Sequence, residues 1–359
     1  MVAAPPSAPA SSPSLRERAD ERPVVLITGA NGEIGRALLK RLHDEGKYRA
    51  VTVDLTPLPE AYRQYCVETY AGNIMDRYLL DQVAAHHEIE VVIHLAALLS
   101  TRGERDPELA HQVNVEGTLH LLRVATNQSS RLGRAVRFIF PSSIAVYGFP
   151  TVAEKDKVGR VQEDACNVPI TMYGCNKLYC EHLGRYFAEH YRQLGALAGA
   201  ARLDFRAIRF PGLISAETVP TGGTSDYGPE ILHAAGKGVP YRCFVGPEAR
   251  LPFMAMPDAV EAMLRLLEAD KKALTRTVYN IGSFSASARD IEARALRAFP
   301  TAPPPEYAPD PVRAKIVDSW PADVDDTAAR KDWGWKPAYD MDRAFSDYLL
   351  PAIKKRYAQ

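Results

Sequence analysis

A glycine-rich turn near the start of the chain constrains the fold more than any other feature. The apolar residues 24–27 are followed at once by Gly29, Gly32 and Gly35, within the stretch VVLITGANGEIG. This spacing is typical of a strand that turns tightly into a helix whose N-terminus can meet a pyrophosphate. The sequence therefore predicts that the chain begins with the βαβ unit of a dinucleotide-binding domain.

Strand and helix patterns alternate beyond this turn. Apolar runs typical of buried parallel strands lie at residues 50–53, 90–95, 137–140 and 204–209. Helical patterns lie between them, at residues 36–46, 106–125 and 171–191. The alternation predicts an α/β fold of the Rossmann type, which is a doubly wound parallel sheet, with a smaller C-terminal substrate-binding part.

Composition divides the chain into three parts. Residues 1–22 are rich in Ala, Pro and Ser and end in mixed charges, which predicts a disordered tail. Residues 23–212 carry the alternating pattern and are expected to form the dinucleotide-binding domain, whereas residues 213–359 have the Gly- and Pro-rich loops of a substrate-binding or lid part. The boundary is expected to be discontinuous, because segments near 255–282 could rejoin the main sheet.

Charge and cysteine content narrow the range of partners. Lys plus Arg equals Asp plus Glu at 44 each, and no basic run carries interleaved aromatic residues, so neither nucleic acid nor a membrane is an expected partner. The five cysteines show no C-x-x-C spacing, which favours a reducing compartment and argues against a structural zinc site. We expect a cytoplasmic protein that binds a small molecule and no metal.

Asp54 bears on the choice of cofactor. It ends the second predicted strand, about 20 residues after the glycine turn, where a carboxylate can accept the ribose hydroxyls and repel a 2′-phosphate. This position predicts NAD rather than NADP. The alternative is that Asp54 is a surface residue that opens the turn before Pro57.

Tyr173 and Lys177 are candidates for proton transfer. They are four residues apart in a helical pattern and so share one face, where a neighbouring ammonium would favour the phenolate. The stretch PSSIAVYG places Ser143 at the carboxyl end of a preceding strand, where it could hold a substrate oxygen. The alternative is that Tyr173 only packs in the core.

The motifs TGANGEIG, HLAA, PSSIAVYG and YGCNK, in this order, resemble the extended short-chain dehydrogenase/reductase superfamily over roughly residues 23–350. The resemblance implies that Ser143, Tyr173 and Lys177 are catalytic and that the protein is an enzyme. Together with the glycine turn and Asp54, it predicts an NAD site formed by Gly29, Asn31, Gly32, Glu33, Ile34, Gly35, Asp54, Asn73, Ile74, Leu95, Ala96, Ala97, Asn114, Tyr173, Lys177 and Pro211.

The second half of the chain carries more specific motifs. The stretches AALLS, GGTSDY and DSWPADVDDTAARKDWGWKP are similar to those of the short-chain type of L-threonine 3-dehydrogenases. This resemblance implies a substrate site formed by Ser100, Ser143, Thr224, Ser225, Asp226 and Trp320. Two residues have structural alternatives, since Asp226 could only cap a helix and Trp320 could belong to the core.

The predicted reaction is the NAD-dependent oxidation of the 3-hydroxyl of L-threonine, or of a close 3-hydroxy amino acid, to L-2-amino-3-oxobutyrate. The alternative enzyme is a nucleotide-sugar 4-epimerase or dehydratase with tightly bound NAD, in which Arg209 and Arg250 could contact phosphates. A non-catalytic NAD-binding regulator is disfavoured, because a binding module needs no proton-transfer residues.

A homodimer is expected from the pattern of one helix. Residues 173–191 carry a broad apolar and aromatic stripe, made of Leu178, Tyr179, His182, Leu183 and Tyr186. Members of the superfamily commonly pair this helix and its neighbour, here residues 111–125, about a two-fold axis. The alternative is that the C-terminal part covers the stripe within one chain.

Overall fold

The computed structural model describes residues 20–194, 203–220 and 222–358. Residues 1–19 of the predicted tail lie outside the described residues. At residue 22 the chain is already tied to the body of the protein, because Arg22 forms an ion pair with Asp20 and donates a hydrogen bond of 3.2 Å to the Gly46 carbonyl. No helix within the described ranges is both long enough and apolar enough to cross a membrane.

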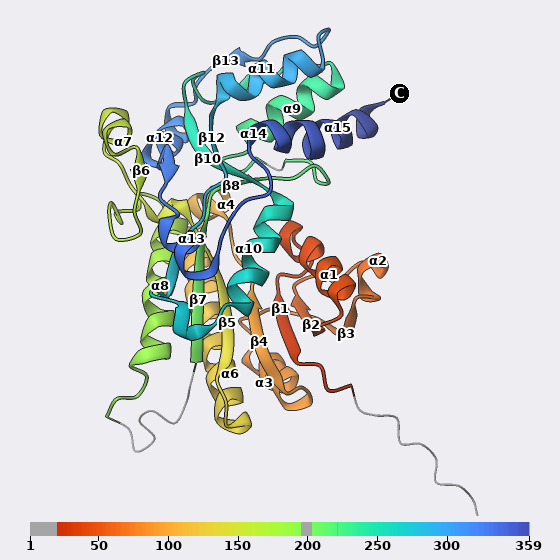
Figure 1. The fold of residues 1–359 in the computed structure, drawn as a ribbon, viewed down its shortest axis with the longest axis vertical. Coiled ribbons are helices and arrows are strands. Elements are labelled where there is room, and N and C mark those ends of the chain that lie inside the picture. The colour runs from red at the N-terminus through yellow and green to blue at the C-terminus, as the bar shows by residue number, and fades with distance from the viewer. Residues whose placement is uncertain (1–19, 195–202, 221, 359) are drawn as a thin grey trace, which may run out of the picture.

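A seven-stranded parallel sheet forms the centre of the molecule (Figure 1). Its strand order is β11-β7-β5-β4-β1-β2-β3, and every neighbouring pair is parallel. The strands are β1 (Val24–Thr28), β2 (Arg49–Asp54), β3 (Cys66–Ala71), β4 (Ile89–His94), β5 (Val136–Ser143), β7 (Leu203–Phe210) and β11 (Val278–Asn280). The order reverses between β1 and β4, where doubly wound sheets open a crevice for ligands. The predicted α/β Rossmann-type fold is confirmed.

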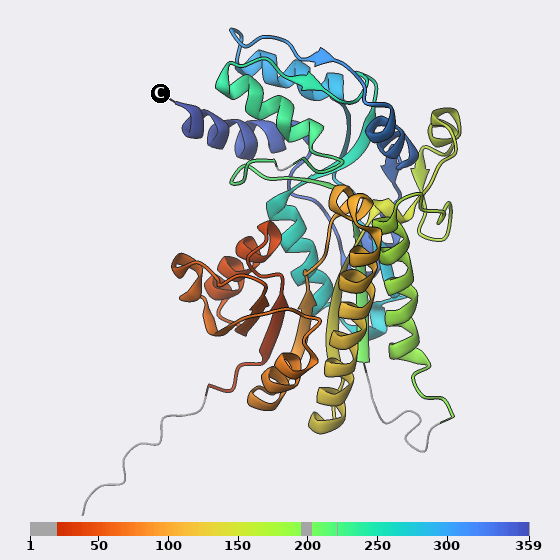
Figure 2. The ribbon, with the colours of Figure 1, turned by 180° about the vertical axis from the view of Figure 1, so that it is seen from behind.

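Helices cover both faces of this sheet (Figures 1 and 2). Alternate strand residues point to opposite faces, so Val25 and Ile27 pack with α1 (Glu33–Glu45) and α10 (Met256–Glu268). On the other face lie α3 (Arg77–His86), α6 (Gly117–Leu132) and α8 (Met172–Glu189). Gly46 ends α1 with a left-handed φ of 65°, as the sequence predicts.

The remaining elements above the sheet form what we call the upper lobe, residues 212–255, 284–320 and 341–358 (Figure 2). Its strands are β8 (Gly212–Ile214), β9 (Arg242–Cys243), β10 (Arg250–Ala255), β12 (Phe284–Ser287) and β13 (Glu306–Tyr307). Its helices are α9 (Tyr227–Lys237), α11 (Ala288–Ala298), α12 (Pro311–Ser319), α14 (Met341–Arg343) and α15 (Leu350–Tyr357). Between β10 and β12 the chain returns to the sheet, where β11 pairs with β7.

The remaining helices and strands are short. They are α2 (Glu60–Arg63), α4 (Ser100–Arg105), α5 (Pro107–His111), α7 (Val152–Val158), α13 (Thr327–Trp333) and the paired strands β6 (Arg160–Val161) and β14 (Asp323–Val324). Short 3-10 helices lie at Ile144–Val146 and Lys271–Ala273, and π-helical turns lie at Gln112–Glu116 and Ala344–Leu349. The helix predicted over 106–125 is thus interrupted by a π-helical turn.

Candidate active site

A cavity of about 750 Å³ lies at the carboxyl ends of the parallel strands, beneath the upper lobe. Every predicted cofactor residue except Asn114 lines it, and so does every predicted substrate residue. The tertiary fold therefore brings together the β1–α1 turn, the ends of β2, β4 and β5, helix α8 and the loop before α9.

The glycine turn is built for close approach by a ligand. Gly29 has a φ of +70°, and a Cβ there would lie 2.5 Å from the backbone nitrogen of Ala96. A Cβ on Gly32 would meet only the Gly29 carbonyl, at 3.2 Å, and so would project into the cavity. Gly32 also begins α1 without a side-chain cap, which leaves the first N–H groups of the helix for an anion.

Asp54 links this turn to β2. One carboxylate oxygen accepts a hydrogen bond from the backbone N–H of Asn31 at 2.9 Å, and the other accepts one from Thr56 at 3.2 Å. Asp54 thus does open a local turn, and it also lines the cavity beside the glycine turn. Both interpretations of this residue describe part of its environment.

Tyr173 and Lys177 lie in the first two turns of α8, which Thr171 caps by accepting a hydrogen bond from Gly174. The Nζ of Lys177 donates a 2.6 Å hydrogen bond to the Pro141 carbonyl and lies 5.5 Å from the centroid of the Tyr173 ring. Ser143 stands opposite, at the end of β5.

The protonation of these groups differs from the expectation that Lys177 favours the phenolate. Desolvation by the surrounding protein raises the pKa of Tyr173 to about 12, and a hydrogen bond with Ser143 offsets this only in part. Burial also lowers the pKa of Lys177 to about 8. Without ligands Tyr173 is therefore neutral, because desolvation outweighs the attraction of an ammonium already bonded to a carbonyl.

Asn114 is a correction, because it lies behind the cavity wall rather than in it. Its side chain accepts a hydrogen bond from the N–H of Leu98 at 2.8 Å and donates to the carbonyl of the same residue at 3.0 Å. It also donates to Asn176 of α8 at 3.3 Å. Asn114 therefore positions the loop after β4 against α8.

The upper lobe contributes the other wall. Ser100 Oγ and Thr224 Oγ1 are 2.8 Å apart. The Asp226 carboxylate accepts hydrogen bonds from the N–H groups of Gly222 and Gly223, at 3.0 and 2.6 Å, and makes no side-chain cap to α9. It therefore shapes the loop rather than capping the helix.

Trp320 belongs both to the core and to the cavity wall. It is 5% exposed and packs in the core of the upper lobe, yet it lines the cavity. Its indole Nε1 is buried without a hydrogen-bond partner among the described residues. A buried donor left unpaired in a cavity wall is suited to a ligand acceptor.

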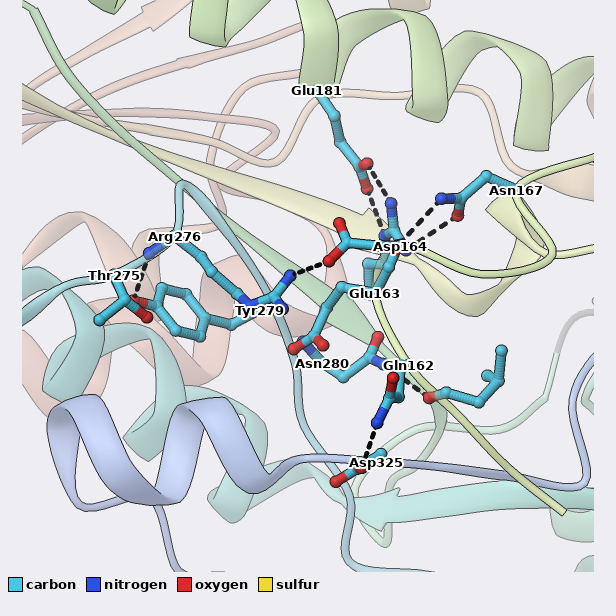
Figure 3. Close-up of polar contacts among 12 residues, drawn as sticks. Gln162, Glu163, Asp164, Asn167, Glu181, Thr275, Arg276, Tyr279, Asn280 and Asp325 are labelled. Carbon is cyan, nitrogen blue, oxygen red and sulfur yellow. Dashed lines mark hydrogen bonds and ion pairs between the residues drawn. The ribbon is translucent and has the colours of Figure 1, made fainter. Parts of the chain in front are cut away.

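Two arginines considered as phosphate contacts lie outside the cavity lining. Arg209 donates to both carboxylate oxygens of Glu181, at 2.6 and 2.9 Å, and to Asn167 at 3.0 Å. Figure 3 shows the Glu181 and Asn167 side chains pointing toward the same region, and both accept hydrogen bonds from Arg209. Arg250 pairs with Asp290 at 2.9 Å. Neither is placed to hold the diphosphate of a nucleotide sugar.

Sequence reasoning missed several wall residues, namely Leu98, Leu99, Arg102, Leu109, Val113 and Phe210. Leu98 and Leu99 lie within the AALLS stretch and Arg102 lies two residues after it, whereas Leu109, Val113 and Phe210 lie in none of the motifs quoted above. Within the described ranges, no group of three or more His, Cys, Asp or Glu side chains could hold a metal ion.

Fold and site together define an enzyme of the Rossmann type that uses a dinucleotide cofactor. The chain belongs to the NAD dependent epimerase/dehydratase family, whose model matches residues 25–282.

Relatives within this family are similar over nearly the whole chain. Mitochondrial L-threonine 3-dehydrogenase from Bos taurus is 35% identical over 340 residues, which cover 94% of this chain and 84% of the relative. The structure of L-threonine dehydrogenase from Clostridium difficile is 30% identical, with a TM-score of 0.81 over 94% of this chain and 99% of that chain. A monomeric L-threonine 3-dehydrogenase from a metagenome is 34% identical, with a TM-score of 0.79 over 93% and 99% of the two chains.

Proposed function

We propose that this enzyme oxidises the 3-hydroxyl of L-threonine, or of a close 3-hydroxy amino acid, to give L-2-amino-3-oxobutyrate, with NAD as its cofactor. The observation that carries the proposal is the shared cavity, whose walls hold the glycine turn, the Ser143–Tyr173–Lys177 group and the small polar set of Ser100, Thr224 and Asp226. The similarity to L-threonine 3-dehydrogenases supports the substrate.

The residues at the glycine turn fit NAD. Gly29 lets the turn pack closely against the backbone of Ala96, Gly32 leaves room for a pyrophosphate to approach the backbone, and the uncapped N-terminus of α1 supplies N–H donors. Asp54 would accept the ribose hydroxyls of the adenosine half, and its charge disfavours a 2′-phosphate. NAD, when bound, accepts the hydride from C3 of the substrate.

The protein residues handle the proton. Ser143 orients the substrate oxygen by a hydrogen bond, and Tyr173, once ionised, takes the hydroxyl proton as the C–H bond breaks. Lys177 keeps a positive charge near the Tyr173 ring, and its bond to the Pro141 carbonyl holds the ammonium in place. Loss of one proton and one hydride converts the secondary alcohol to the ketone.

The polar wall residues suit an amino acid. We assign the ammonium of the substrate to Asp226, the one carboxylate of the upper lobe in the lining. The Ser100–Thr224 pair, which keeps one hydroxyl donor beyond its own hydrogen bond, and the unpaired indole N–H of Trp320 supply donors for the carboxylate. Ser225 lies between Thr224 and Asp226 in the same wall.

One assay tests this function. Purified protein with NAD is offered L-threonine, L-serine, L-allo-threonine and UDP-sugars, with Tyr173→Phe as the inactive control, and NADH absorbance is followed. Net NADH from a 3-hydroxy amino acid supports the proposal. Conversion of a UDP-sugar without net NADH would replace it with the epimerase alternative.

We further propose a homodimer located in the cytoplasm, with residues 23–212 and part of 255–282 as the NAD-binding domain and residues 213–359 supplying most of the lid. The five cysteines are free, which suits a reducing compartment. On α8, Tyr179 and Tyr186 are 54% and 43% exposed, so the upper lobe leaves part of the predicted stripe open. Cell fractionation tests the compartment.

A further inference from the structure

Arg102 lies in the cavity wall but takes no part in the proton-transfer group. It belongs to α4, and its side chain is exposed. Within the described ranges its guanidinium makes no hydrogen bond or ion pair. A cation with five donors and no partner at the edge of a cavity is suited to an anionic ligand.

The backbone that carries Arg102 is held firmly. Ser100 bonds to Thr224, and the Thr101 hydroxyl donates to the Gly222 carbonyl at 3.1 Å. At the other end of α4, Glu104 accepts a hydrogen bond of 2.7 Å from the N–H of Met172 at the start of α8. The position of Arg102 is therefore set by both walls, while its side chain stays free to bind.

The cavity lining has more anionic than cationic side chains. Three carboxylates line it, from Glu33, Asp54 and Asp226, whereas Arg102 and Lys177 are the cationic side chains of the lining. Lys177 is buried and bonded to a main-chain carbonyl. A dinucleotide brings further negative charge on its pyrophosphate, beside Glu33 at the start of α1, so its binding needs a compensating cation.

The geometry of α4 directs Arg102 away from the part of the cavity that we assign to the substrate. Residues two apart on a helix do not share a face, so Arg102 points away from the contact between Ser100 and Thr224. Leu99 lies three residues before it on the same side of α4, and like Leu109 of α5 it is an exposed residue of the cavity lining. Arg102 therefore serves the outer part of the cavity rather than the amino-acid pocket.

We propose that Arg102 binds the pyrophosphate of the dinucleotide, as the side-chain partner of the N–H groups at the start of α1. This inference rests on the proposed use of NAD but not on the proposed substrate. A guanidinium can offer two parallel N–H donors to phosphate oxygens, which an ammonium cannot, so the lysine variant recovers only part of the affinity.

Binding of nucleotide fragments tests the proposal without relying on turnover. Calorimetry compares NAD, ADP and adenosine on the wild type, Arg102→Gln, Arg102→Lys and the matched control Arg105→Gln, which removes an exposed charge from the same helix outside the lining. Arg102→Gln is expected to weaken NAD and ADP about tenfold, after allowance for exposure, and to leave adenosine unchanged. Added salt should weaken ADP binding to the wild type more than to Arg102→Gln.

Several outcomes would overturn the inference. Equal losses for adenosine and ADP would mean that Arg102 only supports the fold, and an equal loss in Arg105→Gln would mean a general charge effect. An unchanged NAD affinity with a raised KM for L-threonine would place Arg102 on the substrate.

NAD binding that depends on Arg102 in a protein that does not oxidise L-threonine would keep this inference and reject the proposed substrate.

Discussion

Ser100 Oγ and Thr224 Oγ1 lie 2.8 Å apart although 124 residues separate them in the chain. Ser100 belongs to α4, which follows β4 at the carboxyl end of the sheet, and Thr224 belongs to the loop before α9. Their hydrogen bond therefore joins the sheet to the upper lobe within the cavity wall. Both hydroxyls are buried. The amino-acid pocket therefore exists only while the two layers are in contact.

Removing one of these hydroxyls should weaken substrate binding. Thr224→Val leaves the Ser100 hydroxyl unpaired, which costs about 1–3 kcal/mol and should raise the KM for L-threonine about tenfold. Steady-state kinetics measure it, and NAD affinity should stay unchanged. The double variant with Ser100→Ala should lose less than the sum of the two single variants, because each removes the same bond. Fully additive losses would show that the two hydroxyls act separately.

Tyr173→Phe should abolish turnover and preserve the site. The ring still packs at the start of α8, but the group that accepts the proton is gone, and a positioned base is worth about 10² to 10⁴ in rate. Single-turnover kinetics give the rate, and calorimetry gives the affinity for NAD, which should stay near that of the wild type. If Tyr173→Phe retained more than about a tenth of the activity, the loss would be smaller than that range, and another residue would be the proton acceptor.

Asp54 should control the choice between NAD and NADP. Asp54→Asn removes the charge and retains an acceptor for the Asn31 N–H, so NADP should be used better while the glycine turn stays in place. Adding Leu55→Arg, at an exposed lining position, supplies a cation for the 2′-phosphate. The readout is the ratio of kcat/KM for the two cofactors. A wild type that already prefers NADP would contradict the cofactor assignment.

His94 should make the fold sensitive to mild acid. Burial, with a smaller effect of the Lys177 charge, lowers its pKa to about 3. Since Thr118 donates its hydroxyl proton to the Asn114 carbonyl, it accepts from His94 Nε2, while Nδ1 accepts from Thr28, so the ring is held neutral.

The unfolded chain binds this proton near pH 6.5 and the folded chain does not. The free energy of unfolding should therefore fall as the pH drops below about 6.5, by up to about 1.4 kcal/mol per pH unit, and level off near pH 3. Urea denaturation at several pH values gives the free energy of unfolding at each pH. This free energy should change less steeply with pH for His94→Asn than for the wild type. The exposed His43→Asn is the control, and an equal change of the unfolding free energy with pH in all three proteins would refute the assignment.

The dimer remains a prediction, and it needs a direct measurement because one similar L-threonine 3-dehydrogenase is monomeric. Light scattering at micromolar concentration should give about twice the 39.6 kDa mass of the chain. Tyr179→Glu with Tyr186→Glu should halve it, because charges would enter the paired α8 helices. Tyr78→Glu, which changes a tyrosine that is 72% exposed on α3, should not. A wild-type particle of single-chain mass would exclude this dimer.

Much of the fold could be predicted because its signals are local. The buried strands read as apolar runs, and the glycine turn requires its residue types for steric reasons. Strand β3 was missed because it lies at the sheet edge, where three of its six residues are partly buried and three are exposed, so it carries no continuous apolar run. The π-helical turn at Gln112–Glu116 was also missed, since periodicity does not distinguish it from an α-helix.

The sequence by itself determined the buried strands of the sheet, the turn at Gly29 and the pairing of Tyr173 with Lys177 on one helix face, because spacing along the chain sets each of them. Only the tertiary structure decided that Asn114 lies outside the cavity lining, that Arg209 forms an ion pair with Glu181 and that Arg102 has no partner among the described residues. Whether a polar side chain faces a partner or a cavity depends on residues that are distant in the chain, 28 positions away for Arg209 and Glu181 and 62 for Asn114 and Asn176. Desolvation in the same assembled site keeps Tyr173 neutral, which no local spacing could reveal.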